Sequence, residues 1–142
     1  MGPAPGQRAS VRIVVTEADT ATRFGSGDVP VLATPRLLAL AEAASVAAVA
    51  PHLAGGTTSV GTGVSLEHRR ASPVGAEIVV EAELTGVDGR RLVFSFIARQ
   101  AAAGREAADP EAPEDLVVGA GTVERVVVDR AKFLARVGAA PA

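Results

Sequence analysis

One segment constrains the fold of this chain more than any other. The run "TPRLLALAEAASVAAVA" begins with Thr-Pro, which is typical of a helix start, and is followed by a further proline and a Gly-Gly pair, which end a helix. It predicts a helix from about Thr34 to about Ala50, with Thr34 as its N-cap. Its side chains are apolar on nearly all sides. Such a helix has to be enclosed, because a helix at a sheet surface keeps a polar stripe.

Most of the remaining chain has the composition of strands. We expect a strand at residues 10–15, a short strand plus a loop before the helix, a strand at 59–68, a hairpin at 76–100, a strand at 116–128 and a short helix at 129–137. The hairpin turn is predicted at Asp88-Gly89. With five or six antiparallel strands and one enclosed helix, the economical arrangement is an α+β fold in which a curved sheet wraps the helix.

The length of 142 residues fits one compact domain. We expect a flexible lead-in at residues 1–9, a single domain at 10–137 with a loop insert at 101–115, and a flexible tail at 138–142. A sheet of this kind has open edges and leaves part of the helix uncovered. A second copy of the chain covers such surfaces in many proteins, so a homodimer is predicted.

Composition excludes several classes of function. The formal net charge of −2, without a dense run of Lys or Arg, argues against nucleic acid as a partner. The absence of cysteine removes disulfides, thiolate zinc sites and thiol nucleophiles. No window offers the ~20 consecutive apolar residues of a membrane span, and the N-terminal residues lack the apolar core of a secretion signal. A soluble cytoplasmic protein with no membrane partner is expected.

Glu42 is the unexpected residue of the predicted helix. Its neighbours one turn away are Leu38 and Val46, and Arg36 lies on another side of the helix. An ionised carboxylate without a partner is costly to bury, so Glu42 has to be neutral, hydrogen-bonded from another element or directed into a wet cavity. The alternative is that it lies on the side of the helix that reaches solvent or a wet dimer seam.

The chain has two histidines as candidate partners for such an acid. His52 follows Pro51 at the helix end, where it is expected to face solvent or the last helix carbonyls, and we do not expect it to be catalytic. His68 ends the strand at 59–68. A histidine there is either structural or a general acid or base, and the residues alone leave both readings open.

Three segments together resemble a known family. They are "VLATPRLLALAEAA", "SVGTGVSLEHRRASPVGAEIVVEAELTGVDGRRLVFSF" and "GAGTVERVVVDRAKFLARV". The run from Val29 to Val137 is similar to the fluoroacetyl-CoA thioesterase-like members of the hotdog-fold thioesterase superfamily. The resemblance rests on the joint order of Thr34, Glu42, Gly61, His68, the "G-R-R-L" hairpin and the "G-T-x-E-R" strand.

The resemblance implies a hotdog fold, a homodimer and hydrolysis of an acyl-CoA thioester at the dimer interface, without metal or organic cofactor. Thr34, Glu42 and His68 match the family's catalytic group, and Gly61 matches a glycine whose backbone lies against the acyl group. Glu42 then attacks the thioester or acts as a base on water, and His68 passes a proton to the thiolate. Thr34 is either the nucleophile or a residue that positions the other groups by hydrogen bonding, and we favour the positioning role of an organiser.

A continuous helix separates Thr34 and Glu42 by about 12 Å along its axis, so the site has to gather groups from different elements or subunits. The phosphates of CoA need cations, for which the candidates are Arg69, Arg70, Arg90 and Arg91.

The sequence also departs from the family. The fluoroacetyl-specific enzyme has phenylalanines in the loop before its catalytic threonine, whereas this chain has "GSGDVPVLA", so fluoroacetyl selectivity is not carried over. The alternative function is a hotdog domain that binds an acyl thioester or another small ligand without turning it over. A hotdog hydratase is not favoured, because the Asp-x-Asn-x-x-His pattern is absent.

Overall fold

The computed structural model describes residues 2–101 and 116–138. The elements in chain order are β1 (Arg8–Val14), η1 (Glu17–Asp19), α1 (Ala21–Phe24), α2 (Thr34–Val49), η2 (Ala50–His52), β2 (Thr57–His68), β3 (Glu77–Asp88), β4 (Arg91–Gln100), β5 (Leu116–Asp129) and α3 (Arg130–Arg136). All but the first residue of the expected loop insert at 101–115 and most of the expected tail lie outside the described residues.

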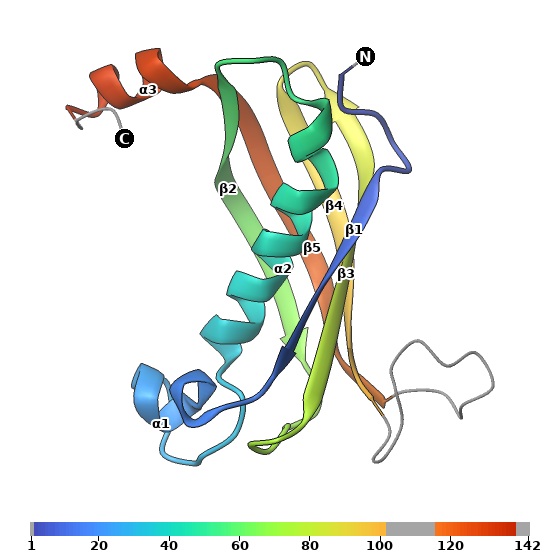
Figure 1. Cartoon of the computed structure of the whole chain (residues 1–142), viewed down its shortest axis with the longest axis vertical. Coiled ribbons are helices and arrows are strands. Elements are labelled where there is room, and N and C mark those ends of the chain that lie inside the picture. Colours follow the sequence, from blue (N-terminus) through green and yellow to red (C-terminus); the bar gives the residue numbers. More distant parts are fainter. Residues whose placement is uncertain (1, 102–115, 139–142) are drawn as a thin grey trace.

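The strands form one five-stranded antiparallel sheet in the order β1-β3-β4-β5-β2. Helix α2 lies along one face of this sheet (Figure 1). The predicted α+β arrangement is therefore confirmed. Strands β1 and β2 are the two edges of the sheet, and each pairs with one neighbour among the described residues.

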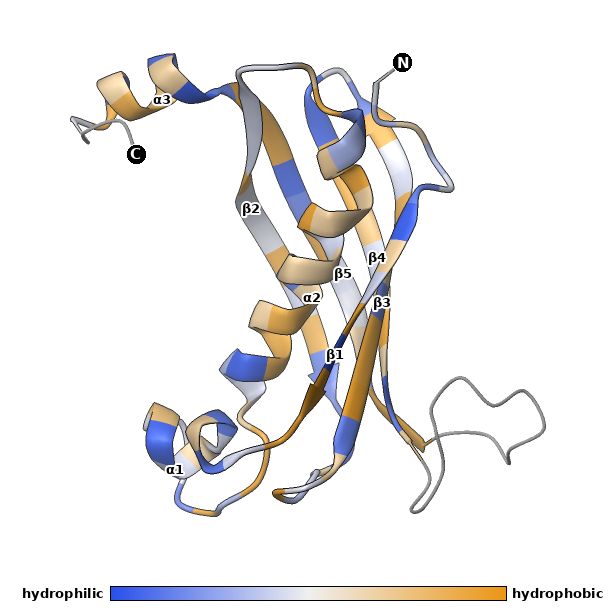
Figure 2. Cartoon of the chain, in the orientation of Figure 1, coloured by the Kyte–Doolittle hydropathy of each residue, from blue (hydrophilic) through white to orange (hydrophobic). Residues whose placement is uncertain are grey.

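The hydrophobic core lies between α2 and the sheet. Leu37, Leu40 and Val49 of the helix pack there against the inward-facing residues of the strands, of which Ile78 and Phe94 are completely buried. In β3 burial alternates from residue to residue, as the period of two of a strand requires. Apolar residues accordingly follow most of α2 and the strands behind it (Figure 2).

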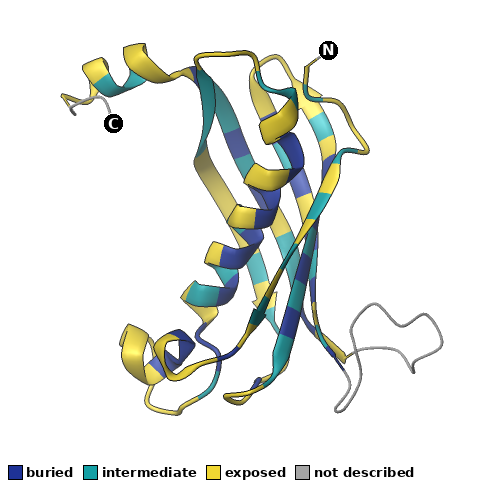
Figure 3. Ribbon diagram, in the orientation of Figure 1, coloured by how far each residue is buried: buried dark blue, intermediate teal, exposed yellow. Residues whose placement is uncertain are grey.

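The helix is enclosed on one side only. Its outer face exposes Ala39, Ala43, Val46 and Ala47, and Val46 is 41% exposed. Exposed and buried stretches alternate along α2 in Figure 3. The absence of a polar stripe from this helix is therefore not explained by burial within a single chain. An apolar outer face of this kind is a surface that a further protein layer can cover.

The start of α2 differs from the prediction. Ala33 is the N-cap and Thr34 is the first helical residue, so the predicted N-cap is wrong. The helix start is held instead from outside, since Arg36 Nε donates to Asp19 Oδ1 at 2.8 Å and the Ala33 N–H donates to the Asp19 carbonyl. The Thr34 hydroxyl is left free for another partner.

The short strand expected before the helix is replaced by two short helical turns, η1 and α1. Thr16 and Asp19 form a capping box around η1, and Gly25 ends α1 in the left-handed conformation with φ 73°. These local interactions favour helical turns over an extended chain. Strand pairing in this segment is limited to isolated bridges such as Thr20 with Leu32.

Strand β2 contains a bulge. Gly61 pairs with Arg125 and Gly63 with the preceding residue of β5, Glu124, so Thr62 is an extra residue in the ladder. Both Gly61 and His68 face α2, because a side chain at Gly61 would meet Glu42 and His68 contacts Thr34.

Helix α3 extends away from the end of the sheet (Figure 1). Most of its side chains are exposed, and Phe133 and Leu134 are half-buried. In the part of the chain that the structure describes, no helix has both the length and the apolar character needed to cross a membrane.

Candidate active site

Thr34 and His68 form the first part of the site. Thr34 Oγ1 and His68 Nδ1 share a hydrogen bond of 2.7 Å between the first residue of α2 and the last residue of β2. The structure thus brings together two predicted site residues that lie 34 positions apart in the chain. A hydroxyl in direct contact with an imidazole is the arrangement by which either group orients or activates the other.

The environment of His68 favours the neutral ring. The side chain is half-buried, and burial lowers its pKa from the ordinary value of 6.5. Its Nε2 atom is buried and has no hydrogen-bond partner among the described residues. A neutral imidazole with one free nitrogen can take up a proton and deliver it to a reacting group.

A cavity of about 310 Å³ lies beside this pair. One wall is the segment before α2, with Gly27, Val29 and Val31, and the rim includes Arg69 and Arg70 after His68. No phenylalanine lines this cavity among the described residues, which agrees with the absence of phenylalanine from the loop before α2.

Glu42 belongs to a second group of contacts in the middle of α2. Its Oε2 atom accepts a hydrogen bond of 3.0 Å from Arg125, whose guanidinium also donates to Ser59 Oγ at 2.8 Å and to the Ser59 carbonyl at 2.9 Å. Arg125 is 8% exposed, and its burial lowers its pKa while the Glu42 carboxylate acts in the opposite direction. Of the outcomes considered for Glu42, hydrogen bonding from another element is observed, and the alternative of a side chain that reaches solvent is met in part, because the side chain is 37% exposed.

Arg125 was not among the predicted site residues. The available signal was periodicity: in "GTVERVVV", Val123 and Arg125 are two residues apart and both are buried, so the arginine occupies an inward-facing position of the strand. A buried arginine needs an acid or several acceptors, and Glu42 is the acid that the sequence left without a partner.

Gly61 leaves the space that the Glu42 carboxylate occupies. A Cβ atom at this position would lie 2.7 Å from Glu42 Oε2 and 3.4 Å from a guanidinium nitrogen of Arg125. The group that approaches this glycine closely is the Glu42 carboxylate, whereas the predicted approach of an acyl group stays a prediction.

The two groups do not meet within one chain. Gly61 and His68 are seven residues apart on β2, a separation of about 20 Å along an extended strand. The structure therefore pairs Thr34 with His68 and Glu42 with Gly61, but it does not bring Glu42 to His68 within the protomer.

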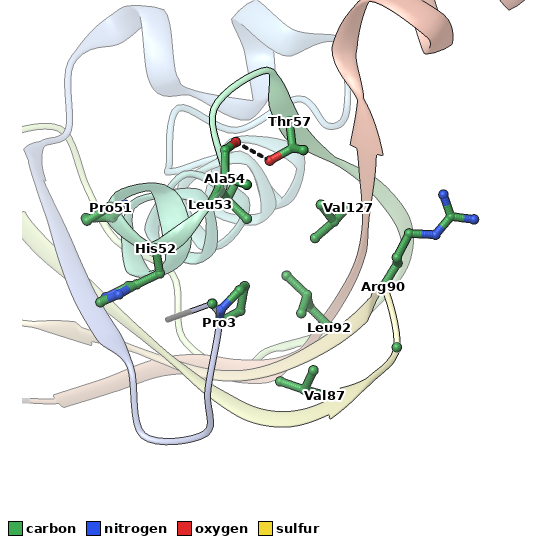
Figure 4. A pocket seen from close by; sticks show the side chains of 12 residues that line it. Pro3, Pro51, His52, Leu53, Ala54, Thr57, Val87, Arg90, Leu92 and Val127 are labelled. Carbon is green, nitrogen blue, oxygen red and sulfur yellow. Dashed lines mark hydrogen bonds between the residues drawn. The ribbon is translucent and has the colours of Figure 1, made fainter.

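The four predicted phosphate-binding arginines do not form one cluster. Arg69 and Arg70 lie beside the start of β5, where their backbone N–H groups donate to Val118, whereas Arg90 is near the end of β5, where its carbonyl accepts from Val127. Arg90 borders a separate pocket of about 570 Å³ that also includes His52 and Leu92 (Figure 4). Arg91 is paired with Glu124 on the outer face of the sheet.

Residues 15–131 match a family described as fluoroacetyl-CoA-specific thioesterase. This range includes both groups of site residues and the whole sheet except β1. The chain belongs to the fluoroacetyl-CoA-specific thioesterase family. Membership confirms the predicted family, the hotdog fold and the hydrolysis of an acyl-CoA thioester.

Individual members of the family and superfamily are similar over most of the chain. The fluoroacetyl-CoA thioesterase of Streptantibioticus cattleyicolor is 38% identical over 107 residues, which are 75% of this chain and 68% of that protein. The solved structure of the fluoroacetyl-CoA thioesterase FlK has 32% identity and a TM-score of 0.80, with 97% of each chain covered. A thioesterase superfamily member from Thermus thermophilus has 26% identity and a TM-score of 0.81, and the match covers 97% of this chain and 93% of that one.

Proposed function

We propose that this thioesterase acts as a homodimer in which each site combines Glu42 of one protomer with Thr34 and His68 of the other. The observation that carries the proposal is the placement of both groups along β2, which is a free edge of the sheet. Because one chain keeps Glu42 and His68 apart, a second copy paired along this edge is the simplest way to unite them.

Antiparallel pairing of β2 with the same strand of a partner provides the required geometry. If the twofold axis passes at Ser65, Val64 lies opposite the partner's Leu66, and the extra residue Thr62 makes Gly61 fall opposite the partner's His68. Neighbouring strands lie about 5 Å apart, so Glu42 comes within reach of a carbonyl carbon held beside that histidine. The exposed run from Gly61 to Ser65 and the apolar outer face of α2 support an interface here.

The chemistry follows from the contacts. Arg125 holds one oxygen of Glu42, and the other is available to attack the thioester carbonyl or to take a proton from an attacking water. As a base, Glu42 takes a proton from water, the new C–O bond forms, the C–S bond breaks, and this proton passes through the neutral ring of the partner's His68 to the leaving thiolate. As a nucleophile, Glu42 displaces the thiolate and forms a mixed anhydride. Water then hydrolyses the anhydride and restores the carboxylate, while the partner's His68 takes the proton of that water and delivers it to the thiolate. Thr34 orients that imidazole through its 2.7 Å hydrogen bond, which supports its role as organiser.

The lack of phenylalanine in the described lining of the Thr34–His68 cavity favours an acyl group other than fluoroacetyl, and screening identifies that group. The test is thiol release from a panel of acyl-CoA thioesters by the native protein, Glu42→Gln and His68→Ala. We expect release by the native protein and a loss of at least about a hundredfold in either variant. Binding of a thioester without any release would instead support the non-catalytic ligand-binding function.

The cytoplasmic location and the absence of a nucleic-acid partner stay predictions.

A further inference from the structure

A basic hollow lies at the end of the sheet from which α3 extends. It has a volume of about 620 Å³ and includes Arg90 from the β3–β4 turn and Lys132 and Arg136 from α3. The acid of this hollow, Asp129, caps α3 by accepting from the Lys132 N–H at 2.9 Å. Among the described residues, none of the three cationic side chains forms an ion pair. Three cations without carboxylate partners form a site for an anion of high charge.

The hollow is close to the proposed reaction centre. Asp129, which precedes α3, pairs with Thr57 at the start of β2. Thr57 is four residues from Gly61, which places the base of α3 about 13 Å from Gly61 along the strand. The pantetheine arm of CoA, which separates the thioester sulfur from the pyrophosphate, is longer than this distance when extended.

The proposed dimer places further cations on the same side. Where Gly61 lies opposite the partner's His68, the start of β2 runs beside the residues that follow that histidine, and these include the partner's Arg69 and the partner's Arg70. Helix α3 begins at this point and extends beyond its own sheet on the side of β2 (Figure 1). This is the edge along which the partner is proposed to pair.

We infer that the phosphates of the acyl-CoA are bound between Arg90, Lys132 and Arg136 of one protomer and Arg69 and Arg70 of the partner subunit. This inference rests on the proposed function, because it concerns the nucleotide end of the same site. It adds two α3 residues that the sequence did not indicate, and it leaves out Arg91, whose guanidinium is held by Glu124. Both α3 side chains are exposed, so they are free to change conformation around a ligand.

The test compares two substrates with the same acyl group. Lys132→Gln/Arg136→Gln is expected to raise KM for the acyl-CoA by about tenfold, since two exposed phosphate contacts are lost. The kcat for acyl-CoA and the KM for the acyl-pantetheine, which has no phosphate, are expected to stay unchanged. Arg8→Gln/Arg12→Gln is the matched control, because it removes the same charge from β1 at the opposite edge of the sheet.

The outcomes separate this inference from the proposed function. The phosphate site is overturned, while the thioesterase activity stands, by either of two results. The first is a KM for acyl-CoA that is the same in the double variant and the native protein. The second is a KM that rises equally for acyl-CoA and acyl-pantetheine. If the native protein releases no thiol, calorimetric titration with CoA decides instead. Weaker binding to the double variant than to the control supports the site, and equal binding overturns it.

The location of α3 can be tested separately because the chain has no cysteine. In the variant Ala71→Cys/Lys132→Cys, a short bis-maleimide is expected to join the two positions across the interface and to give a covalent dimer on a denaturing gel. Cross-linking that gives only monomers would overturn the contact of α3 with the partner. Ala71→Cys/Arg8→Cys is the control pair and is expected to stay monomeric on the gel.

Discussion

Glu42 of α2 and Arg125 of β5 form an ion pair of 3.0 Å that joins the centre of the helix to the sheet. The guanidinium is buried, whereas the carboxylate side chain is 37% exposed. The pair is therefore asymmetric: Arg125 is fixed by three hydrogen bonds in the interior, and Glu42 has one oxygen directed by that arginine while the rest of the group stays accessible. This arrangement orients an acid without enclosing it.

The asymmetry predicts how substitutions at this pair affect stability. Glu42→Leu is expected to lower the free energy of unfolding by about 3 kcal/mol, because it leaves a buried guanidinium without its carboxylate. Glu42→Leu/Arg125→Met removes both charges and is expected to recover most of that loss, although it stays inactive. Urea denaturation of the two variants measures the difference. Equal destabilisation in the single and the double variant would show that the pair has no energetic coupling.

Gly61→Ala is expected to reduce activity far more than stability. The new Cβ atom would lie 2.7 Å from Glu42 Oε2, so the flexible end of the glutamate has to shift by a fraction of an ångström. It keeps its ion pair with Arg125 but loses its alignment at the reaction centre. We expect kcat to fall by more than about tenfold, with a change in the free energy of unfolding below about 1 kcal/mol. Gly63→Ala is the control, because its Cβ would have only an ordinary contact at 3.9 Å, with Glu124. Full activity of Gly61→Ala would contradict the placement of Glu42 at the site.

Mixing inactive variants tests whether the site is shared between subunits. When Glu42→Gln and His68→Ala chains are unfolded together and refolded, each mixed dimer has one intact site if the site spans two protomers. About a quarter of the native activity is then expected, because half of the dimers are mixed and each has one working site of two. A site contained within one chain predicts no recovery, and so does refolding of either variant alone.

The lowered pKa of His68 predicts an activity that persists into mildly acidic conditions. Burial disfavours the charged ring, so the imidazole stays neutral at pH values where a solvent-exposed histidine is protonated. The acid limb of kcat/KM is therefore expected to have its midpoint below pH 6.5. His52→Asn is the control and should leave this limb in place, whereas a limb centred above pH 6.5 would contradict the burial argument.

The same shift has a consequence for folding. The unfolded chain binds a proton at His68 at a higher pH than the native protein does, so acidification favours the unfolded state. This contribution to stability is complete above the unfolded pKa of about 6.5 and is lost as the pH falls from there toward the lower native pKa. His68→Asn is expected to reduce the dependence of the urea midpoint on pH in this window.

The strands and the long helix were predictable because their patterns are local. The Thr-Pro start and the Pro and Gly-Gly end delimit α2 to within one residue of the observed Thr34–Val49. The segment before α2 has one local signal that the strand prediction overlooked, the Thr16–Asp19 capping box of η1. Its other support is the ion pair of Asp19 with Arg36, a residue 17 positions later. Contacts of this range have no local sequence signal.

The candidate site shows the same limit. Thr34, Glu42 and His68 were indicated by the family resemblance, and the question of how Glu42 tolerates its apolar neighbours followed from helical periodicity alone. The answer, Arg125, is 83 residues away and depends on the register of β5 against β2. A single sequence contains no pattern from which this register can be read.

The extra residue Thr62 determines which side chains of the edge strand β2 face the helix. An unbroken strand places residues an odd number apart on opposite faces, and Gly61 and His68 are seven apart, yet both lie over the helix. A chain without the extra residue would present either the glycine or the histidine to the outside of the sheet. Insertions and deletions between these two positions are therefore tolerable only in even numbers, a counting rule that a functional relative has to obey whatever its other substitutions.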